Sequence, residues 1–353
     1  MKPATIRDVA ERAAVSVASV SRVLNGAGPV TEATRQRVLE AVEALQYVPH
    51  SGARSLSTSK TNTVGVILPD LYGEFFSELI RGMDVAARAL GYHLIVSSSH
   101  DDADEASSAI RSMRGRVDGL IVLSPHLGAA NLASGLAGRT PVLLMNGGAG
   151  ADGRPSIVVD NHGGAVAAVE HLIATGRRRI AHIAGPAGNL EAEARLAGYL
   201  EAMAAAGLPT MVVDGAFTKA SGQDAGAALA ARPDRPDAVF AANDNMAVGA
   251  LLAFQDAGLR VPEDVAMVGF DDIPLAALVR PGLTTLKIQI AETGRKALER
   301  LVRLIGSAAD TACEVVRPEL VVRASSNPVL RPSGLSGAAS TDVQKMSLEG
   351  EKL

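Results

Sequence analysis

Apolar residues near the N-terminus recur at helical spacing, first over 6–10 and again over 20–24. A bend at Ala14-Val15 separates the two patterns, and Ser16 stands where its hydroxyl can accept from free backbone N–H groups of the second helix. The pattern predicts two short helices joined by a tight turn. A helix-turn-helix DNA-binding unit and a plain helical hairpin share this pattern, so periodicity alone leaves both open.

A third helical pattern starts after Thr31, a good N-cap, and runs to about Gln46. We expect Pro49 to end this helix, because proline cannot continue it. Residues 50–60 are rich in serine and small side chains, and on composition alone they predict a flexible linker.

From residue 63 onward, short apolar runs alternate with helical stretches. Near-continuous apolar runs between helices indicate buried parallel strands. About ten such runs are more than one sheet comfortably holds. We therefore expect an α/β core of two Rossmann-like lobes, with a ligand cleft between them at the carboxyl ends of the strands. The runs are 63–69, 92–98, 119–124, 141–146, 156–160, 179–185, 211–214, 238–242, 265–270 and 283–288.

The charge distribution sets the N-terminal end apart from the rest. The chain has 353 residues, enough for two or three domains, and a net charge of −4. Residues 1–60 hold eight Lys or Arg against five Asp or Glu, which leaves −7 on the remainder. A basic N-terminal segment in an otherwise acidic chain is consistent with a nucleic-acid contact confined to the N-terminal end.

Signals for export or membrane insertion are missing from the sequence. There is neither a basic n-region followed by an apolar h-region nor an apolar run that approaches 18 residues. The lone Cys313 excludes an intrachain disulfide and fits a reducing compartment; we expect it to be a small buried hydrophobe. These observations predict a cytoplasmic protein without a membrane partner.

Residues 8–26 have the sequence D-V-A-x-x-A-x-V-S-x-x-x-V-S-R-V-L-N-G. This segment resembles the headpiece of the LacI/GalR family of bacterial transcription regulators. The likeness continues through 30–38, 47–49 and 53–56, and then over the core to about residue 323. The resemblance implies a DNA-binding regulator that represses genes of carbohydrate uptake and catabolism. It also implies a homodimer on a pseudo-palindromic operator in double-stranded DNA, with a sugar in the cleft controlling operator affinity.

For the DNA contact, the resemblance implies a helix-turn-helix headpiece over 1–48 and a hinge helix over 49–61 that folds when two subunits meet on DNA. The small, exposed start of the second helix can approach base edges in the major groove, and Arg22 has the reach to bond guanine. Leu56 matches a leucine that wedges between two central base pairs and bends the duplex. The candidates for DNA contact are Thr5, Ser16, Val17, Ala18, Ser19, Ser21, Arg22, Asn25, Ala53 and Leu56.

For the core over 62–327, the resemblance implies the type I periplasmic-binding-protein fold. The tail over 328–353 is rich in Gly, Ser and Ala and lacks leucine heptads, so we expect it to be disordered. We expect neither a metal nor a cofactor. The expected lobes are 62–160 with 290–319, and 161–289 with 320–327.

The expected cleft carries the chemistry of polyol recognition. Carboxylates, amides and a guanidinium bond ring hydroxyls, while an aromatic face covers the apolar side of a sugar. Mapped through the family motifs, Asp244 and Asp272 are better explained as capping or supporting groups. The effector-binding candidates are Asp70, Phe75, Phe76, Asn146, Arg195, Phe217, Asn243 and Asp271.

Three positions depart from the family pattern. Gly73-Glu74 replaces the usual Asn-Pro of the first loop, so that wall can differ in shape and charge. Ile288 stands where relatives often place a polar residue. Asn189 stands in the loop where a purine-binding relative uses an arginine, which favours a sugar. A purine or a partner protein as the effector remains the alternative.

The sequence has no complete enzyme motif among those considered, so it does not favour a catalytic function. The S-x-x-K match over 57–60 lies in the expected hinge and lacks the rest of a β-lactamase-type site. The sequence contains no G-x-S-x-G, Walker or H-E-x-x-H motif. A transport-binding protein would share the core, but it would need an export signal and no headpiece. We therefore expect a regulator and not an enzyme.

Overall fold

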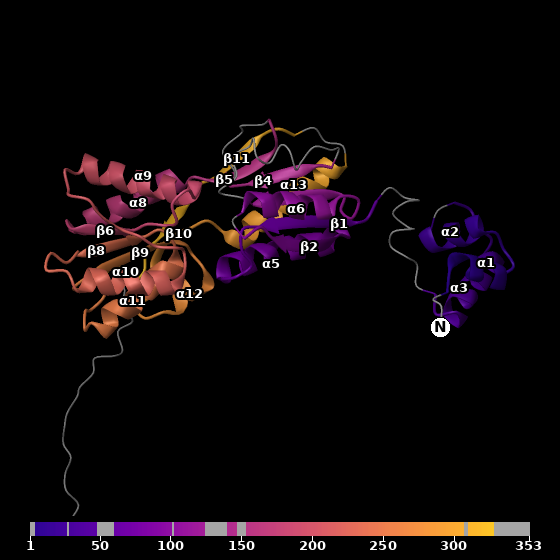
Figure 1. Cartoon of the computed structure of the whole chain (residues 1–353), viewed down its shortest axis with the longest axis horizontal. Helices are drawn as coiled ribbons and strands as arrows, with labels where there is room; N and C mark the ends of the chain where they lie inside the picture. Colours follow the sequence, from indigo (N-terminus) through magenta and orange to yellow (C-terminus); the bar gives the residue numbers. More distant parts are fainter. Residues whose placement is uncertain are drawn as a thin grey trace, which may run out of the picture.

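The structure of the chain is a computed structural model. Within the described residues the chain forms a small helical unit and two α/β lobes (Figure 1). The predicted hinge, with Ala53 and Leu56, and the predicted tail lie outside these residues, apart from Lys60 and Thr61 at the end of the hinge. The structure describes residues 4–26, 28–47, 60–100, 102–123, 140–146, 153–306 and 310–327.

The helices of the N-terminal unit each begin after a hydroxyl residue, Thr5, Ser16 or Thr31, whose side chain accepts a hydrogen bond from the first helical turn. Ala14, with a φ of 51°, lies in the tight turn predicted between the first two helices. Buried valines and alanines from all three helices form a small core of their own. The helices are α1 (Ile6–Arg12), α2 (Val17–Asn25) and α3 (Glu32–Ala44).

Each lobe is built on a six-stranded sheet, and the two sheets repeat the same strand order. The neighbouring strands are parallel, except for the antiparallel pair at one edge of the second sheet. The first sheet runs β11 (Cys313–Val316), β5 (Ser156–Val159), β4 (Val142–Met145), β3 (Gly119–Leu123), β1 (Thr63–Leu68) and β2 (His93–Ser98). The second runs β12 (Glu319–Val321), β10 (Thr284–Lys287), β9 (Ala266–Asp271), β8 (Ala238–Ala241), β6 (Ile180–Ile183) and β7 (Met211–Val213).

The apolar runs predicted as strands form β1 to β10. Strands β3, β4, β8 and β9 are buried at every position. Helices on both faces of each sheet exclude water from these strands, which is why their sequences lack polar alternation.

Helices α8 and α9 cover one face of the second sheet, and α10 and α11 cover the other (Figure 1). In the first lobe, α5 and α13 pack against each other and against the sheet. The first lobe contains α5 (Glu74–Leu90), α6 (Ala103–Met113) and α13 (Ile290–Ile305). The second contains α8 (Asn161–Ala174), α9 (Leu190–Ala205), α10 (Lys219–Ala230), α11 (Asp244–Asp256) and α12 (Pro274–Leu278).

The chain passes between the lobes after β5, after β10 and after β11. The second passage brings α13 back to the first lobe, where it lies very close to α5. A Cβ atom on Gly82 would lie 1.8 Å from the carbonyl oxygen of Ala291, and one on Gly294 would lie 2.3 Å from that of Leu79. Glycine is therefore required at both contact points.

The segment after α13 differs from the prediction. Ten apolar runs were predicted as strands and none of them lies within 290–319, but in the structure α13 ends at Ile305 and the strand β11 follows within that range. The prediction that Cys313 is buried was wrong, because its side chain is exposed. The strand β11 lies at the edge of its sheet, so alternate side chains along it face solvent.

Candidate functional sites

A cavity of about 150 Å³ lies between the two lobes. Its walls come from the carboxyl ends of strands in both sheets. Asp70 follows β1, Phe217 follows β7, Asn243 follows β8 and Asp271 ends β9. Ligands of α/β proteins bind at this end of parallel strands, because the loops there converge. The cavity is therefore the candidate ligand site of the core.

Most of the effector-binding candidates lie around this one cavity. Asn146 is not among its lining residues; it follows β4 and has a φ of 54°. The candidates that line the cavity are Asp70, Phe75, Phe76, Arg195, Phe217, Asn243 and Asp271.

Further lining residues were not among those candidates. Tyr72 lies in the same loop as Asp70, and Thr218 directly follows Phe217. Each of these could have been found by extending a recognised strand-end motif by one or two positions. The residues concerned include Tyr72, Asn189, Glu191, Thr218 and Asn245.

Aromatic side chains are concentrated around the cavity. The whole chain has only four Tyr and six Phe and no Trp, yet Tyr72, Phe75, Phe76 and Phe217 all line this site. The rings of Phe75 and Phe76 are perpendicular, with centroids 5.2 Å apart. Such rings offer flat apolar surface beside the polar groups of the second lobe.

Arg195 is the one basic side chain among the lining residues that the structure describes, and it is held from several sides. Its Nε donates to Oδ1 of Asn161 at 2.8 Å, and its Nη1 donates to the carbonyl oxygen of Ala242. The guanidinium carbon lies 3.8 Å from the ring centroid of Phe270. These contacts fix the guanidinium before any ligand arrives.

Asp271 faces Arg195 but is not fully bonded. Its Oδ1 lies 3.6 Å from Nη2 of Arg195 and accepts no hydrogen bond from the described residues. Burial raises the pKa of Asp271 to about 7; the positive charge of Arg195 opposes the shift, and the carboxylate of Glu191 adds to it. Asp271 and Asp272 both have positive φ, at 115° and 58°. Such strained backbone is often found at binding sites.

The two aspartates expected to be capping or supporting groups, Asp244 and Asp272, bond to the protein itself. Asp244 is fully buried and accepts from the hydroxyl of Thr285 at 2.6 Å and from the N–H of Ile273 at 2.9 Å. Burial, with the nearby Asp271 carboxylate, raises the pKa of Asp244 well above its usual range. Asp272 pairs with Arg323 at 2.7 Å. Both aspartates support the strand ends around the cavity instead of lining it.

Three polar lining residues also cap helices. Asn189 accepts from the first turn of α9, Thr218 from that of α10 and Asn243 from that of α11. Asn243 also donates through Nδ2 to the carbonyl oxygen of Phe217 at 3.1 Å, which holds that loop. Helix capping therefore places these side chains at the cavity.

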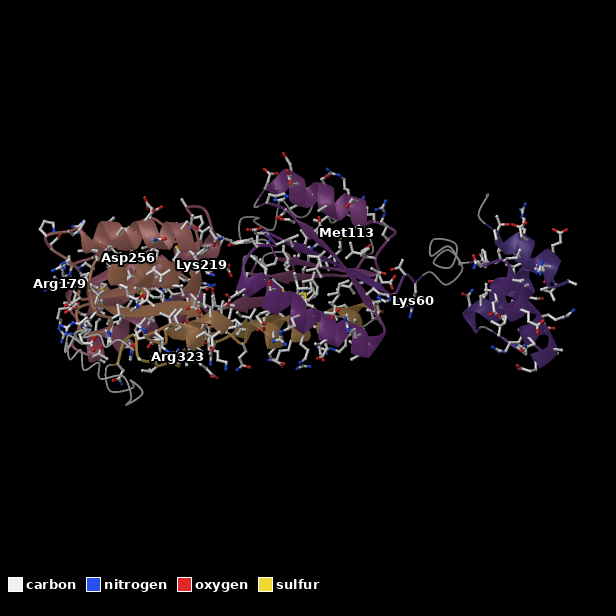
Figure 2. All side chains as sticks on the ribbon, turned by 90° about the horizontal axis from the view of Figure 1, so that it is seen from below. Lys60, Met113, Arg179, Lys219, Asp256 and Arg323 are labelled. Atoms are coloured by element: carbon white, nitrogen blue, oxygen red, sulfur yellow. The ribbon has the colours of Figure 1, made fainter. Side chains whose placement is uncertain are left out.

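Glu74, which departs from the family pattern, joins the two lobes. It begins α5 in the first lobe, and its Oε2 accepts from the N–H of Leu275 in α12 at 3.0 Å. Its Oε1 lies 4.0 Å from Nζ of Lys219, which begins α10. Figure 2 shows Lys219 at the end of its helix that faces the first lobe.

The DNA-contact candidates of the headpiece lie on and around α2. Val17 and Ala18 are exposed at the start of this helix, and Arg22 is exposed about one turn later. Ser16 caps the helix by accepting from the N–H of Ser19 at 3.1 Å. The remaining candidates make local contacts: Thr5 caps α1, and Asn25 donates to the hydroxyl of Ser21 at 3.2 Å.

The described residues contain neither a candidate metal cluster nor a helix suited to cross a membrane. No cluster of three or more His, Cys, Asp or Glu side chains there is suited to a metal ion. Nor does any helix in those parts of the chain have the length and apolar character needed to cross a bilayer.

Two family models match the chain. A model described as bacterial regulatory proteins of the lacI family matches residues 5–50, and a periplasmic binding protein-like domain matches residues 169–326. Catabolite control protein A of Priestia megaterium is 36% identical over 304 residues, which cover 85% of this chain and 92% of that protein.

Solved structures are similar over nearly the same length. The Lac repressor dimer bound to operator and the anti-inducer ONPF has a TM-score of 0.83 and 30% identity, and the match covers 92% of this chain and 99% of that one. A complex of the transcriptional regulator CelR with cellobiose has a TM-score of 0.65 and 33% identity, over 91% of this chain and 99% of that one.

Proposed function

Because this chain belongs to the LacI family of bacterial regulatory proteins, we propose that it represses genes of carbohydrate uptake and catabolism and is controlled by a small sugar. Membership makes the chain a DNA-binding transcriptional regulator with a ligand-binding core. The proposal adds the class of effector, its residues and the direction of control.

The assignment of a sugar as the effector rests on the composition of the cavity wall. Aromatic rings of the first lobe lie across from Arg195, Asn243 and Asp271 of the second lobe. A sugar presents an apolar ring face and several hydroxyls, and this wall offers a partner for each. The related CelR structure contains cellobiose, which supports the same class of effector.

On the DNA side, we propose that a homodimer in the cytoplasm binds a pseudo-palindromic operator. Each α2 would lie in the major groove, with Val17, Ala18 and Arg22 toward the bases. Leu56 would wedge into the minor groove at the centre of the operator. The related Lac repressor structure is a dimer bound to operator, which supports this arrangement.

Control follows from a population shift. Sugar bound between the lobes favours one relative arrangement of the lobes over the other, because it contacts both. If that arrangement disfavours the hinge contacts on DNA, the sugar weakens operator binding, and operator DNA weakens sugar binding by the same factor.

Calorimetry tests the effector class directly. The full chain is titrated with a panel of monosaccharides and disaccharides and, in parallel, with purine bases. The proposal expects saturable binding of at least one sugar and weaker binding of it by the Asp271→Ala variant. Binding of a purine with no response to any sugar would overturn the sugar assignment.

A further inference from the structure

Negative charge prevails among the described side chains that line the cleft. Asp70, Glu191 and Asp271 are carboxylates, and Arg195 is the single cation among these described lining residues. The formal charges of these four side chains sum to a negative value whether or not Asp271 carries a proton. A ligand with its own negative charge would therefore enter against a repulsive field.

The single described cation already faces an anion of the protein. Arg195 donates to Asn161 and to the carbonyl oxygen of Ala242, and its Nη2 lies 3.6 Å from Oδ1 of Asp271. A phosphate or carboxylate that bonded to this guanidinium would place a second negative charge beside Asp271. An uncharged hydroxyl can bond to Nη2 without adding that charge.

Helix N-termini are the other common anion site, and here they are capped from within. The first turns of α9, α10 and α11 donate to Asn189, Thr218 and Asn243. An anion would have to displace these caps to bond to the backbone N–H groups from which they accept.

The N-terminus of α5 lacks a side-chain cap, but its first turn carries Glu74. That carboxylate is bonded to the N–H of Leu275 and lies 4.0 Å from Lys219. The nearby lysine is therefore already beside an anion of the protein. Neither an open helix end nor a free cation in the described cleft balances an incoming negative charge.

We propose that the cleft selects its ligand by charge: it accepts an uncharged sugar or polyol and excludes the phosphorylated or carboxylated form of the same compound. This inference rests on the proposed function, because it takes the ligand to be a sugar. The effector would then be the substrate of a phosphorylating reaction and not its product.

The test compares matched ligands on the full chain by calorimetry. Glucose, galactose, mannose and ribose are measured beside their terminal-carbon phosphates, and the hexoses also beside their uronic acids. For the sugar that binds most tightly, the charged forms are expected to bind at least ten-fold more weakly at 0.15 M salt. This difference in affinity between the neutral and charged forms is expected to become smaller at 0.5 M salt, because salt screens electrostatic repulsion but does not change the steric fit.

Two variants separate charge from size. Glu191→Gln removes a lining charge and keeps the shape of the side chain. The dissociation constant of the charged form of the sugar, divided by that of the neutral form, is therefore expected to fall several-fold. Glu193→Gln removes the same charge from an exposed position of the same helix, and the ratio is expected to stay as in the parent. Equal effects of the two variants would overturn the assignment to the cleft carboxylates.

The outcomes also separate this inference from the function on which it rests. A phosphorylated sugar that binds as tightly as its neutral form, or more tightly, overturns charge selection and leaves the sugar effector in place. If neither form of any sugar binds, the sugar effector fails and charge selection fails with it.

Discussion

Asp271 is a buried acid in the wall of the cleft and lies opposite the fixed guanidinium of Arg195. Burial raises the pKa of Asp271 to about 7 and outweighs the opposing positive charge of Arg195, which lies 3.6 Å away; the carboxylate of Glu191 adds a smaller upward shift. Near neutral pH this residue therefore alternates between acceptor and donor. A hydroxyl, which can both donate and accept, bonds to either form.

The raised pKa makes the stability of the core depend on pH. Asp271 holds its proton more tightly in the folded chain, so its contribution is complete below about pH 4 and is lost as the pH rises through about 7. The Asp271→Asn variant has no carboxyl group at this position, so it does not lose stability in this way as the pH rises. In urea unfolding, the free energy of the variant relative to the parent is expected to rise between pH 5 and pH 8.

The same unfolding series on Asp272→Asn is the control, because that carboxylate is paired with Arg323. A relative free energy of Asp271→Asn that stays constant from pH 5 to pH 8 would contradict the shifted titration.

Strand-end motifs made several cleft residues recognisable before the fold was known. Asp271 and Asn243 end or follow apolar runs, and Arg195 lies in a family motif. The titration of Asp271 could not be foreseen, because it depends on burial and on Glu191 from another element. Asn146 follows a strand too, but the backbone there does not bring it to the cavity.

At the scale of elements, close contact between helices holds α13 on the first lobe. This helix comes from the far end of the chain, after the second lobe has been completed. Its position on α5 depends on glycines at both contact points, because backbone atoms approach to distances that a Cβ atom cannot share.

Gly294→Ala is expected to destabilise the core by about 1–3 kcal/mol, as overpacking does in well-packed interiors. The matched control is Gly306→Ala at the end of the same helix, where an added Cβ would meet only ordinary contacts at 3.4 Å or more. Thermal unfolding of the two variants checks this. Equal melting temperatures would show that α5 and α13 can separate without cost.

The helix α2 carries the prediction for DNA. Arg22 is exposed on it, one turn after the small residues at its start. Arg22→Ala is expected to cost about 1–3 kcal/mol of operator affinity and to relax preference mainly at one base pair. Fluorescence titrations on an operator and its single-base variants measure this. Equal weakening on operator and unrelated DNA would mean that Arg22 contacts only the backbone.

The strands were predicted correctly where every residue of the strand is buried. Strands such as β3 and β8 are apolar throughout, and helices separate them, so their order along the chain indicated two doubly wound lobes. The strand β11 was missed because its four residues alternate on a sheet edge and include Glu314. Nothing local marks so short an edge strand.

For the whole molecule, the contact between the lobes is the feature on which the proposed control of DNA binding depends. Glu74 of the first lobe bonds to Leu275 of the second and lies beside Lys219. The sequence indicated only that this wall would differ in charge from its relatives. That Glu74 bridges the lobes depends on where α12 lies, which no local pattern encodes.

Glu74→Ala is expected to leave the N–H of Leu275 without its acceptor. Hydrogen exchange followed by mass spectrometry is then expected to show faster exchange at the start of α12. Glu78→Ala is the control, since Glu78 lies on the same helix but pairs with Arg81 of its own lobe. Unchanged exchange in Glu74→Ala would mean that the bridge does not persist in solution.

The proposed function requires that a sugar in the cleft controls operator affinity through Arg195 and its neighbours. The most direct measurement is operator binding by the parent and Arg195→Ala, with and without the sugar that calorimetry identifies. We expect the sugar to weaken operator binding by the parent about 5- to 150-fold. The variant is expected to bind operator like the sugar-free parent and not to respond to the sugar. A variant that remains folded and responds to the same sugar concentration as the parent would show that the sugar does not act through Arg195.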